Sequence, residues 1–200
     1  MIVPGTSSQA VAAQLATELD ESLADVDVRR FADGELLVEV PPQDGRAIVV
    51  AATGSSDAHI QLLQLQDAVR EAGADEVITV IPYMGYARQD QAFEPGQPVS
   101  ARAMAKAIGS GTDRVLTVNP HEPGIREFFP VPTTVLDAAS QLAEPLPADL
   151  TAPIFLAPDH GAIDLAETVR DASGTGETDA FEKHRDRDTG AVEITPATLD

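Results

Sequence analysis

The 200-residue sequence contains no cysteine, and only 4% of its residues are aromatic. The absence of cysteine excludes disulfide bonds, thiolate metal sites and a cysteine nucleophile. Long apolar runs are also absent: none approaches the length that spans a membrane, and the first residues lack the basic region of a signal peptide. We therefore expect a cytoplasmic protein that does not associate with membranes.

Basic residues are scarce as well. Thirteen lysines and arginines face 33 acidic residues, which gives a formal net charge of -20, and only Lys106 and Lys183 are lysines. Such a surface repels nucleic acid and anionic membranes, and it also repels itself unless salt screens the charge. An acidic disordered tail would give the same total, but the acids here are spread between apolar periodic segments. This distribution favours a folded protein with a halophilic surface.

Apolar segments of strand and helix type alternate along the chain, which indicates a parallel α/β sheet. An apolar stripe at Val11, Leu15 and Leu19 marks a first helix. The further strands are expected at Ala47–Ala52, Glu76–Pro82 and Arg114–Val118, and the helices at Ile60–Val69, with a stop at Gly73, and at Ser100–Ile108.

A proline-rich stretch, 131–153, interrupts this pattern and contains one helical run. It predicts a boundary between a first domain, 1–136, and a second domain, 137–200. In the second domain we expect a strand at Ile154–Ala157, a helix at Ala162–Val169 and a mobile segment at Ser173–Asp179, which is rich in Gly, Thr and Ser.

The loop that follows Pro82 contains Arg88, Gln89 and Asp90 between a strand and a helix. Ligands of parallel sheets bind beyond the carboxyl ends of the strands, and a guanidinium can donate two hydrogen bonds to a phosphate. The loop is therefore a candidate anion site. Alternatively, Arg88 and Asp90 form only a surface ion pair.

His121 and Asp159 also follow predicted strands, so both could contribute to a magnesium site. The alternatives are a structural or exposed histidine and an aspartate that caps the next helix. Between Val26 and Val40, the sequence FADGE predicts a hairpin with its tip at Asp33 and Gly34. An ordinary β-turn would explain the same pattern.

Taken in order, the segments FADGE, PYMGYARQD with the following SAR, NPHEPGIREFF, APDHG and FEKHR resemble the ribose-phosphate pyrophosphokinase family. Members of that family make phosphoribosyl pyrophosphate and AMP from ATP and ribose 5-phosphate. The resemblance covers most of the chain and implies an α/β fold with two phosphoribosyltransferase-like domains, each a parallel sheet flanked by helices.

The resemblance also implies a role for each matched residue. The hairpin would contact the adenine of a neighbouring subunit, so it implies a homo-oligomer of at least two chains. Mg²⁺ would be held by His121 and Asp159, while Lys183 and Arg185 would lie on a flexible catalytic loop and Arg185 would also bind substrate. The implied ATP-binding residues are Phe31, Asp33, Gly34, Glu35, Arg88, Gln89 and Asp90.

Two departures from the family pattern leave other functions open. Asn119 stands where many relatives have an acid, and the sugar-phosphate loop of the family would follow Asp200, so we expect an incomplete second domain. One alternative is a catalytically inactive relative or a truncated regulatory module that binds nucleotide or a full-length partner. Another is a nucleobase phosphoribosyltransferase, which would require the same loop and would have no use for the ATP motifs.

The pair Lys183 and Arg185 generates the first prediction. Because preorganised cations act on the transferring group, Lys183→Ala or Arg185→Ala should lower kcat by roughly 10³- to 10⁵-fold and change ATP affinity far less. Steady-state kinetics and ATP titration of each variant measure the two effects. A variant with normal kcat would show that the pair is an ordinary solvated charge cluster.

Overall fold

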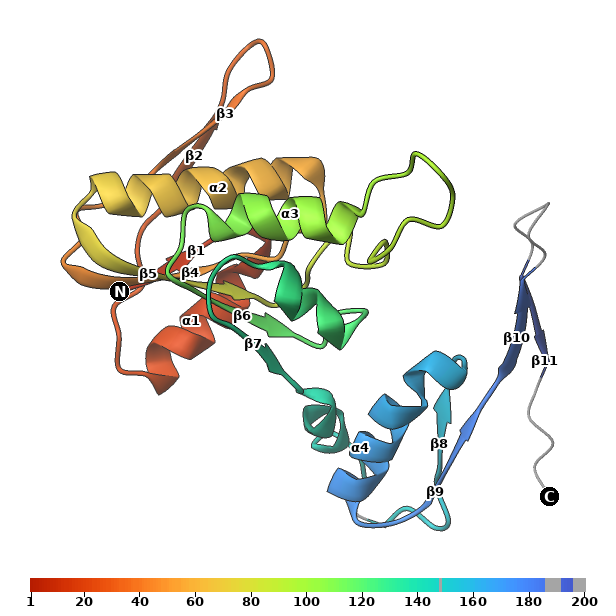
Figure 1. The fold of residues 1–200 in the computed structure, drawn as a ribbon. Helices are drawn as coiled ribbons and strands as arrows, with labels where there is room; N and C mark the ends of the chain where they lie inside the picture. The colour runs from red at the N-terminus through yellow and green to blue at the C-terminus, as the bar shows by residue number, and fades with distance from the viewer. Residues whose placement is uncertain (148, 186–191, 196–200) are drawn as a thin grey trace. The chain divides into compact units, whose positions relative to one another are not determined.

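The computed structural model describes residues 1–147, 149–185 and 192–195. The chain divides into two compact units, Met1–Leu136 and Asp137–Asp200 (Figure 1). We refer to them as the first and second units.

The first unit is built on five parallel strands in the order β1-β4-β5-β6-β7. Apolar and β-branched residues dominate these strands, as is usual where both faces of a parallel sheet are covered. The predicted strands at Ala47–Ala52, Glu76–Pro82 and Arg114–Val118 are confirmed as β4, β5 and β6. The bounds are β1 (Ile2–Pro4), β4 (Gly45–Val50), β5 (Ala74–Ile81), β6 (Arg114–Val118) and β7 (Thr133–Leu136).

Helices cover both faces of this sheet (Figure 1). Helix α1 (Gln9–Glu18) packs against one face, while α2 (Ser56–Glu71) and α3 (Ser100–Gly109) pack against the other. The alternation of strand side chains separates two apolar clusters: Ile48 and Val50 of β4 lie with α1, whereas Val49 lies with α2 and α3. The predicted helices at Ile60–Val69 and Ser100–Ile108 are confirmed, and α2 ends before Gly73, whose φ is +114°.

The predicted apolar stripe of α1 is only partly the contact face: Leu15 packs against the sheet cluster, but Val11 and Leu19 do not. Val11 and Leu19 are 47% and 50% exposed, whereas Ala12 and Ala16 are buried against the sheet. Small side chains allow the helix to lie close to the strands, so Ala12 and Ala16 form the centre of the contact and Leu15 packs at its border.

The chain then passes along the open edge of β1 and forms the predicted hairpin. The Ile2 amide donates to Ser22 O, and the Ala24 amide donates to Ile2 O. Strands β2 (Asp27–Arg30) and β3 (Leu36–Glu39) pair antiparallel, and Gly34 at the tip has a φ of +93°. The hairpin is attached to α2, where Gln64 Nε2 donates to Leu36 O at 2.8 Å.

The second unit contains a parallel pair, β8 (Ile154–Ala157) and β9 (Glu177–Ala180), connected through α4 (Ile163–Ser173). An antiparallel pair, β10 (Glu182–Arg185) and β11 (Val192–Thr195), follows. The predicted strand and helix of this unit are confirmed as β8 and α4. The 3₁₀ segments of the two units are Thr6–Ser8, Pro123–Phe128, Ala139–Ala143 and His160–Ala162.

Two strands lie where the sequence pattern predicted none. Strand β7 lies inside the stretch 131–153, and β9 begins inside the segment that was expected to be mobile. Both strands are short, and their hydrogen bonds come from β6 and β8, which are distant in sequence. Tertiary pairing therefore sets their conformation. Among the described residues, no helix is both long and apolar enough for a membrane span.

A chain of polar side chains crosses the core of the first unit. Gln66 Nε2 donates to Thr79 Oγ1 at 2.9 Å, Thr79 donates to Thr112 Oγ1 at 3.0 Å, and Thr112 reaches Val77 O at 2.8 Å. Thr79 is fully buried and connects the other two side chains. A buried donor that loses its acceptor keeps its full desolvation cost.

Thr79→Val should therefore lower the free energy of unfolding by about 1–3 kcal/mol, because the isosteric valine leaves Gln66 Nε2 without an acceptor. Denaturant titration measures the change. Thr134→Val, the same substitution at an exposed position of β7, is the control and should alter stability by less than about 0.5 kcal/mol. Equal effects of the two substitutions would contradict a structural role for the buried hydroxyl.

Candidate functional site

Two loops meet at the carboxyl edge of the large sheet. One follows β5 and contains Arg88, and the other follows β6 and contains His121. Parallel pairing of the two strands, with Ile81 beside Thr117, brings the loops to the same edge. Together they line a pocket of about 340 Å³, formed by Tyr83, Met84, Tyr86, Ala87, Arg88, Asn119, Pro120 and His121. We call it the edge pocket.

The shape of the first loop depends on close contact between Gly85 and Thr53. A Cβ atom on Gly85 would lie 2.0 Å from Thr53 O, so only glycine fits there. The Gly85 amide donates to Thr53 Oγ1 at 3.0 Å, and the Thr53 amide donates to Tyr83 O at 2.9 Å. Tyr86, the next residue, has a φ of +62°, which is uncommon for a residue other than glycine. These contacts set the backbone path that leads to Arg88.

His59 of α2 packs against Tyr86 of this loop. Its ring centroid lies 5.4 Å from that of Tyr86, and the Tyr86 hydroxyl lies 3.3 Å from Ser56 Oγ. His59 is only 6% exposed, and its Nε2 has no hydrogen-bond partner among the described residues. Burial lowers the pKa of His59, so the imidazole is neutral near pH 7.

Arg88 and Asp90 do not pair. Arg88 is exposed, and among the described residues it forms no ion pair with Asp90 or any other carboxylate. The alternative of a surface ion pair is therefore wrong. Gln89 is half-buried and accepts a hydrogen bond from Ser100 Oγ at 2.6 Å. The guanidinium of Arg88 is thus left for another anion.

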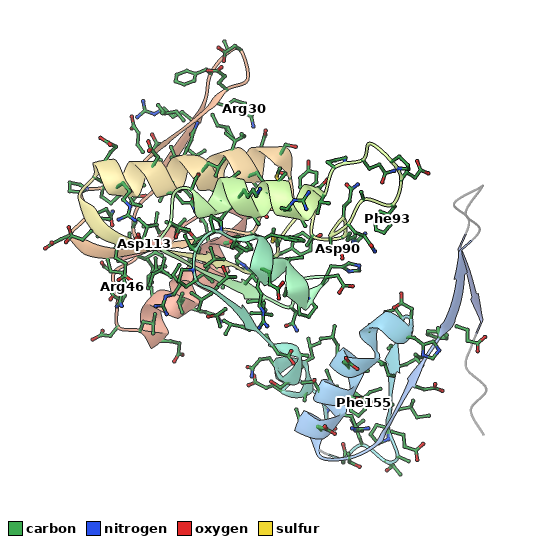
Figure 2. All side chains as sticks on the ribbon, in the orientation of Figure 1. Arg30, Arg46, Asp90, Phe93, Asp113 and Phe155 are labelled. Carbon is green, nitrogen blue, oxygen red and sulfur yellow. The ribbon has the colours of Figure 1, made fainter. Side chains whose placement is uncertain are left out.

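The hairpin tip does not reach the edge pocket within this chain. Phe31 is 50% exposed, and Asp33, Gly34 and Glu35 are exposed beside it. Asp33 Oδ1 accepts from the Glu35 amide at 3.1 Å, an interaction that also stabilises an ordinary turn. Figure 2 shows Arg30 on the hairpin well separated from Asp90 and Phe93 on the loop after β5.

The remaining predicted residues belong to the second unit. Asp159 follows β8, and its Oδ1 accepts from the Gly161 amide at 3.1 Å, which is the helix-capping geometry of the alternative reading. The backbone of Lys183 and Arg185 lies in β10, opposite Ile194 and Val192, instead of in an open loop. The side chains of Lys183 and Arg185 lie outside the described part of the structure.

The described residues do not form a cage for Mg²⁺. No group of three or more His, Asp or Glu side chains among them is arranged to hold a metal ion. Asn119 and His121 are the metal-capable side chains among the described residues that line the edge pocket. Mg²⁺ keeps several waters and commonly binds through substrate phosphates with few protein ligands. This donor set fits an ion that enters with a nucleotide and does not fit a permanently bound ion.

Sequence reasoning missed Thr53, Gly85 and His59, which shape and support the loop. The only signal at His59 is a polar residue on the apolar face of a helix, a feature it shares with the buried Gln66. Thr53 and Gly85 are 32 positions apart, so no local pattern links them.

Residues 1–110 match the family model of the N-terminal domain of ribose phosphate pyrophosphokinase. A ribose-phosphate pyrophosphokinase of Halobacterium salinarum is 66% identical over 187 residues, which cover 92% of this chain and 66% of the relative. The enzyme of the same name from Methanopyrus kandleri is 42% identical over 206 residues, covering all of this chain and 70% of the relative. The chain thus spans about two thirds of the length of these relatives.

A solved structure is also similar to this chain. The crystal structure of phosphoribosylpyrophosphate synthetase from Mycobacterium smegmatis matches with a TM-score of 0.77 and 25% identity. The match covers 98% of this chain and 66% of that one.

His59 generates a prediction about pH. The folded chain holds this imidazole neutral, whereas the unfolded chain binds a proton below the ordinary pKa of 6.5. Below pH 6.5 the unfolded chain therefore binds more protons than the folded chain. The free energy of unfolding falls as the pH decreases through 6.5, and His59 contributes at most about 1.4 kcal/mol per pH unit to this fall. His59→Phe should reduce this dependence.

Urea titrations at pH 7.5 and pH 5.5 test the prediction. The wild type should lose more stability between the two pH values than His59→Phe does, while His121→Ala, which removes an exposed histidine, should behave as the wild type. Identical losses in the wild type and His59→Phe would refute it.

Proposed function

Because the chain belongs to the ribose-phosphate pyrophosphokinase family, we propose that it binds magnesium ATP at the edge pocket. The proposed reaction transfers the diphosphoryl group of ATP to the anomeric hydroxyl of ribose 5-phosphate. That hydroxyl attacks the β-phosphorus, the bond from the β-phosphorus to the bridging oxygen of the α-phosphate breaks, and AMP leaves. The protein would act in the cytoplasm, without nucleic acid or membrane partners.

The observation that supports the proposal is the position of Arg88 beside His121 in one pocket. Most of the charge on this protein is negative, so its surface opposes the approach of a polyanion. Arg29, Arg30, Arg70 and Arg170 are each paired with carboxylates, whereas Arg88 pairs with none among the described residues. An unpaired guanidinium at the carboxyl edge of a parallel sheet is suited to bind phosphate.

His121 and Asn119 would meet the metal that accompanies the nucleotide. Asp159, in the second unit, is a further proposed metal ligand. When bound, Mg²⁺ neutralises charge on the phosphate oxygens of ATP. The protein groups themselves would position the nucleotide: Arg88, Gln89 and Asp90 would hold it next to His121. Positioning and charge neutralisation provide most of the catalysis in phosphoryl transfer, because little covalent help is needed.

The hairpin would act on a second copy of the chain. Its tip residues are exposed and lie away from the edge pocket of their own chain, so Phe31 is available to pack on a base held elsewhere. Asp33, Gly34 and Glu35 would contact the polar edge of that base. We therefore propose a homo-oligomer of at least two chains, in which each hairpin completes a neighbouring ATP site.

Lys183 and Arg185 would stabilise the transferring group, and Arg185 would also contact the sugar phosphate. The backbone of both residues lies in β10. The antiparallel partner β11 would support this strand during turnover.

Arg88→Ala should weaken magnesium ATP binding by about tenfold to a hundredfold, because it removes charged hydrogen bonds to phosphate. Calorimetric titration in molar potassium chloride measures the affinity. Arg114→Ala is the matched control, since Arg114 is exposed at the start of β6, at the opposite edge of the same sheet. Equal affinities of Arg88→Ala and the wild type would contradict the proposed site.

The reaction itself is tested by AMP release from magnesium ATP with and without ribose 5-phosphate. AMP that depends on the sugar and disappears in Lys183→Ala supports the diphosphokinase. A folded chain that binds ATP but releases no AMP would instead be a nucleotide-binding relative or a regulatory module.

A further inference from the structure

Gln89 and Ser100 are hydrogen-bonded to each other at the base of the loop between β5 and α3. They are 11 positions apart, and their side chains meet through the bond from Ser100 Oγ to Gln89 Oε1 at 2.6 Å. The intervening positions 91–98 are all exposed, whereas Gln89 and Ser100 are half-buried. The Gln89–Ser100 pair therefore joins the exposed loop to the packed part of the first unit.

The backbone of Gln89 is held as firmly as its side chain. The Ala101 amide in the first turn of α3 donates to Gln89 O at 3.1 Å, and the Gln89 amide donates to Tyr86 O at 3.2 Å. The second bond closes a turn that includes Arg88. The first residues of α3 thus hold both the backbone and the side chain of Gln89, and with them the end of the turn that contains Arg88.

Helix capping does not account for the Ser100 hydroxyl. The N-cap residue of α3 is Val99, which makes no side-chain cap bond, and Ser100 is the first helical residue. Serine is favoured one position earlier, where its oxygen would accept from the helix backbone. Here the hydroxyl donates to Gln89 instead, so its role concerns the loop and not the helix.

The direction of this bond determines what Gln89 can offer to a ligand. A glutamine amide has one carbonyl oxygen that accepts and one NH₂ group that donates. Ser100 donates to one of the two lone pairs of this oxygen and so holds it toward α3, while the NH₂ remains able to donate. Gln89 directly follows Arg88 in the sequence, and its NH₂ and the Arg88 guanidinium are both donors. Phosphate oxygens, which only accept, are the matching ligand atoms.

We infer that Ser100 is a positioning residue, which orients Gln89 and the Arg88 turn so that both donate to the phosphate groups of a bound nucleotide. The inference rests on the proposed function and extends it to a residue that does not touch the ligand. Without the hydroxyl, the Gln89 amide can rotate and present its oxygen, which repels phosphate.

Ser100→Ala should weaken magnesium ATP binding by about threefold to tenfold, the effect of losing one hydrogen bond. Ser100→Thr keeps the hydroxyl and should restore affinity. Adenosine, which lacks phosphate, should bind Ser100→Ala as it binds the wild type. Ser110→Ala is the matched control, because it removes a hydroxyl from the other end of α3, where Ser110 Oγ donates to Ala107 O at 2.7 Å.

Titration calorimetry of the four proteins with magnesium ATP and with adenosine gives the decisive comparison, and thermal unfolding shows whether each variant is folded. ATP binding by Ser100→Ala at wild-type affinity would overturn the inference, and so would an equal loss of ATP and adenosine affinity. A wild type that binds no ATP would instead overturn the proposed function. The two failures are therefore distinguishable.

Discussion

The parallel pairing of β5 with β6 is the constraint on which the candidate site depends. Ile81 lies beside Thr117, so both strands end at the same edge of the sheet, and the loops that contain Arg88 and His121 meet there. Helices α2 and α3 bury one face of these strands in a continuous apolar cluster. Because a one-residue shift in register would exchange the faces of a strand, burial of that cluster fixes the alignment of the loops.

Local contacts then convert this alignment into a defined pocket. Thr53 lies just beyond β4, and its contact with Gly85 leaves no space for a side chain on the loop. His59 supports the next residue, Tyr86, without any hydrogen bond from its own Nε2 among the described residues. The loop is thus held by the end of one strand and the first turns of two helices, while its exposed part beyond Gln89 is free to meet a ligand or a second chain.

Much of the first unit could be predicted from the sequence because its central strands are short apolar runs between glycine and proline signals. The contact face of α1 could be predicted only in part, since Leu15 of the apolar stripe packs on the cluster but Ala12 and Ala16 form its centre. Strands β7 and β9 depend on pairing with distant strands. At the site, Arg88 and His121 were predicted from their positions after strands, whereas Thr53, Gly85 and His59 act through packing that no local pattern reveals. The roles of the predicted residues remain predictions.

The central claim is that the carboxyl edge of the first unit binds the phosphates of ATP. A crystal structure with Mg²⁺ and a non-hydrolysable ATP analogue, grown in molar potassium chloride, tests it most directly. The account predicts electron density for the triphosphate between Arg88 and His121, with the Gln89 NH₂ directed toward it and Ser100 still bonded to Gln89 Oε1. A triphosphate bound elsewhere on the first unit, with the edge pocket filled only by solvent, would contradict the account.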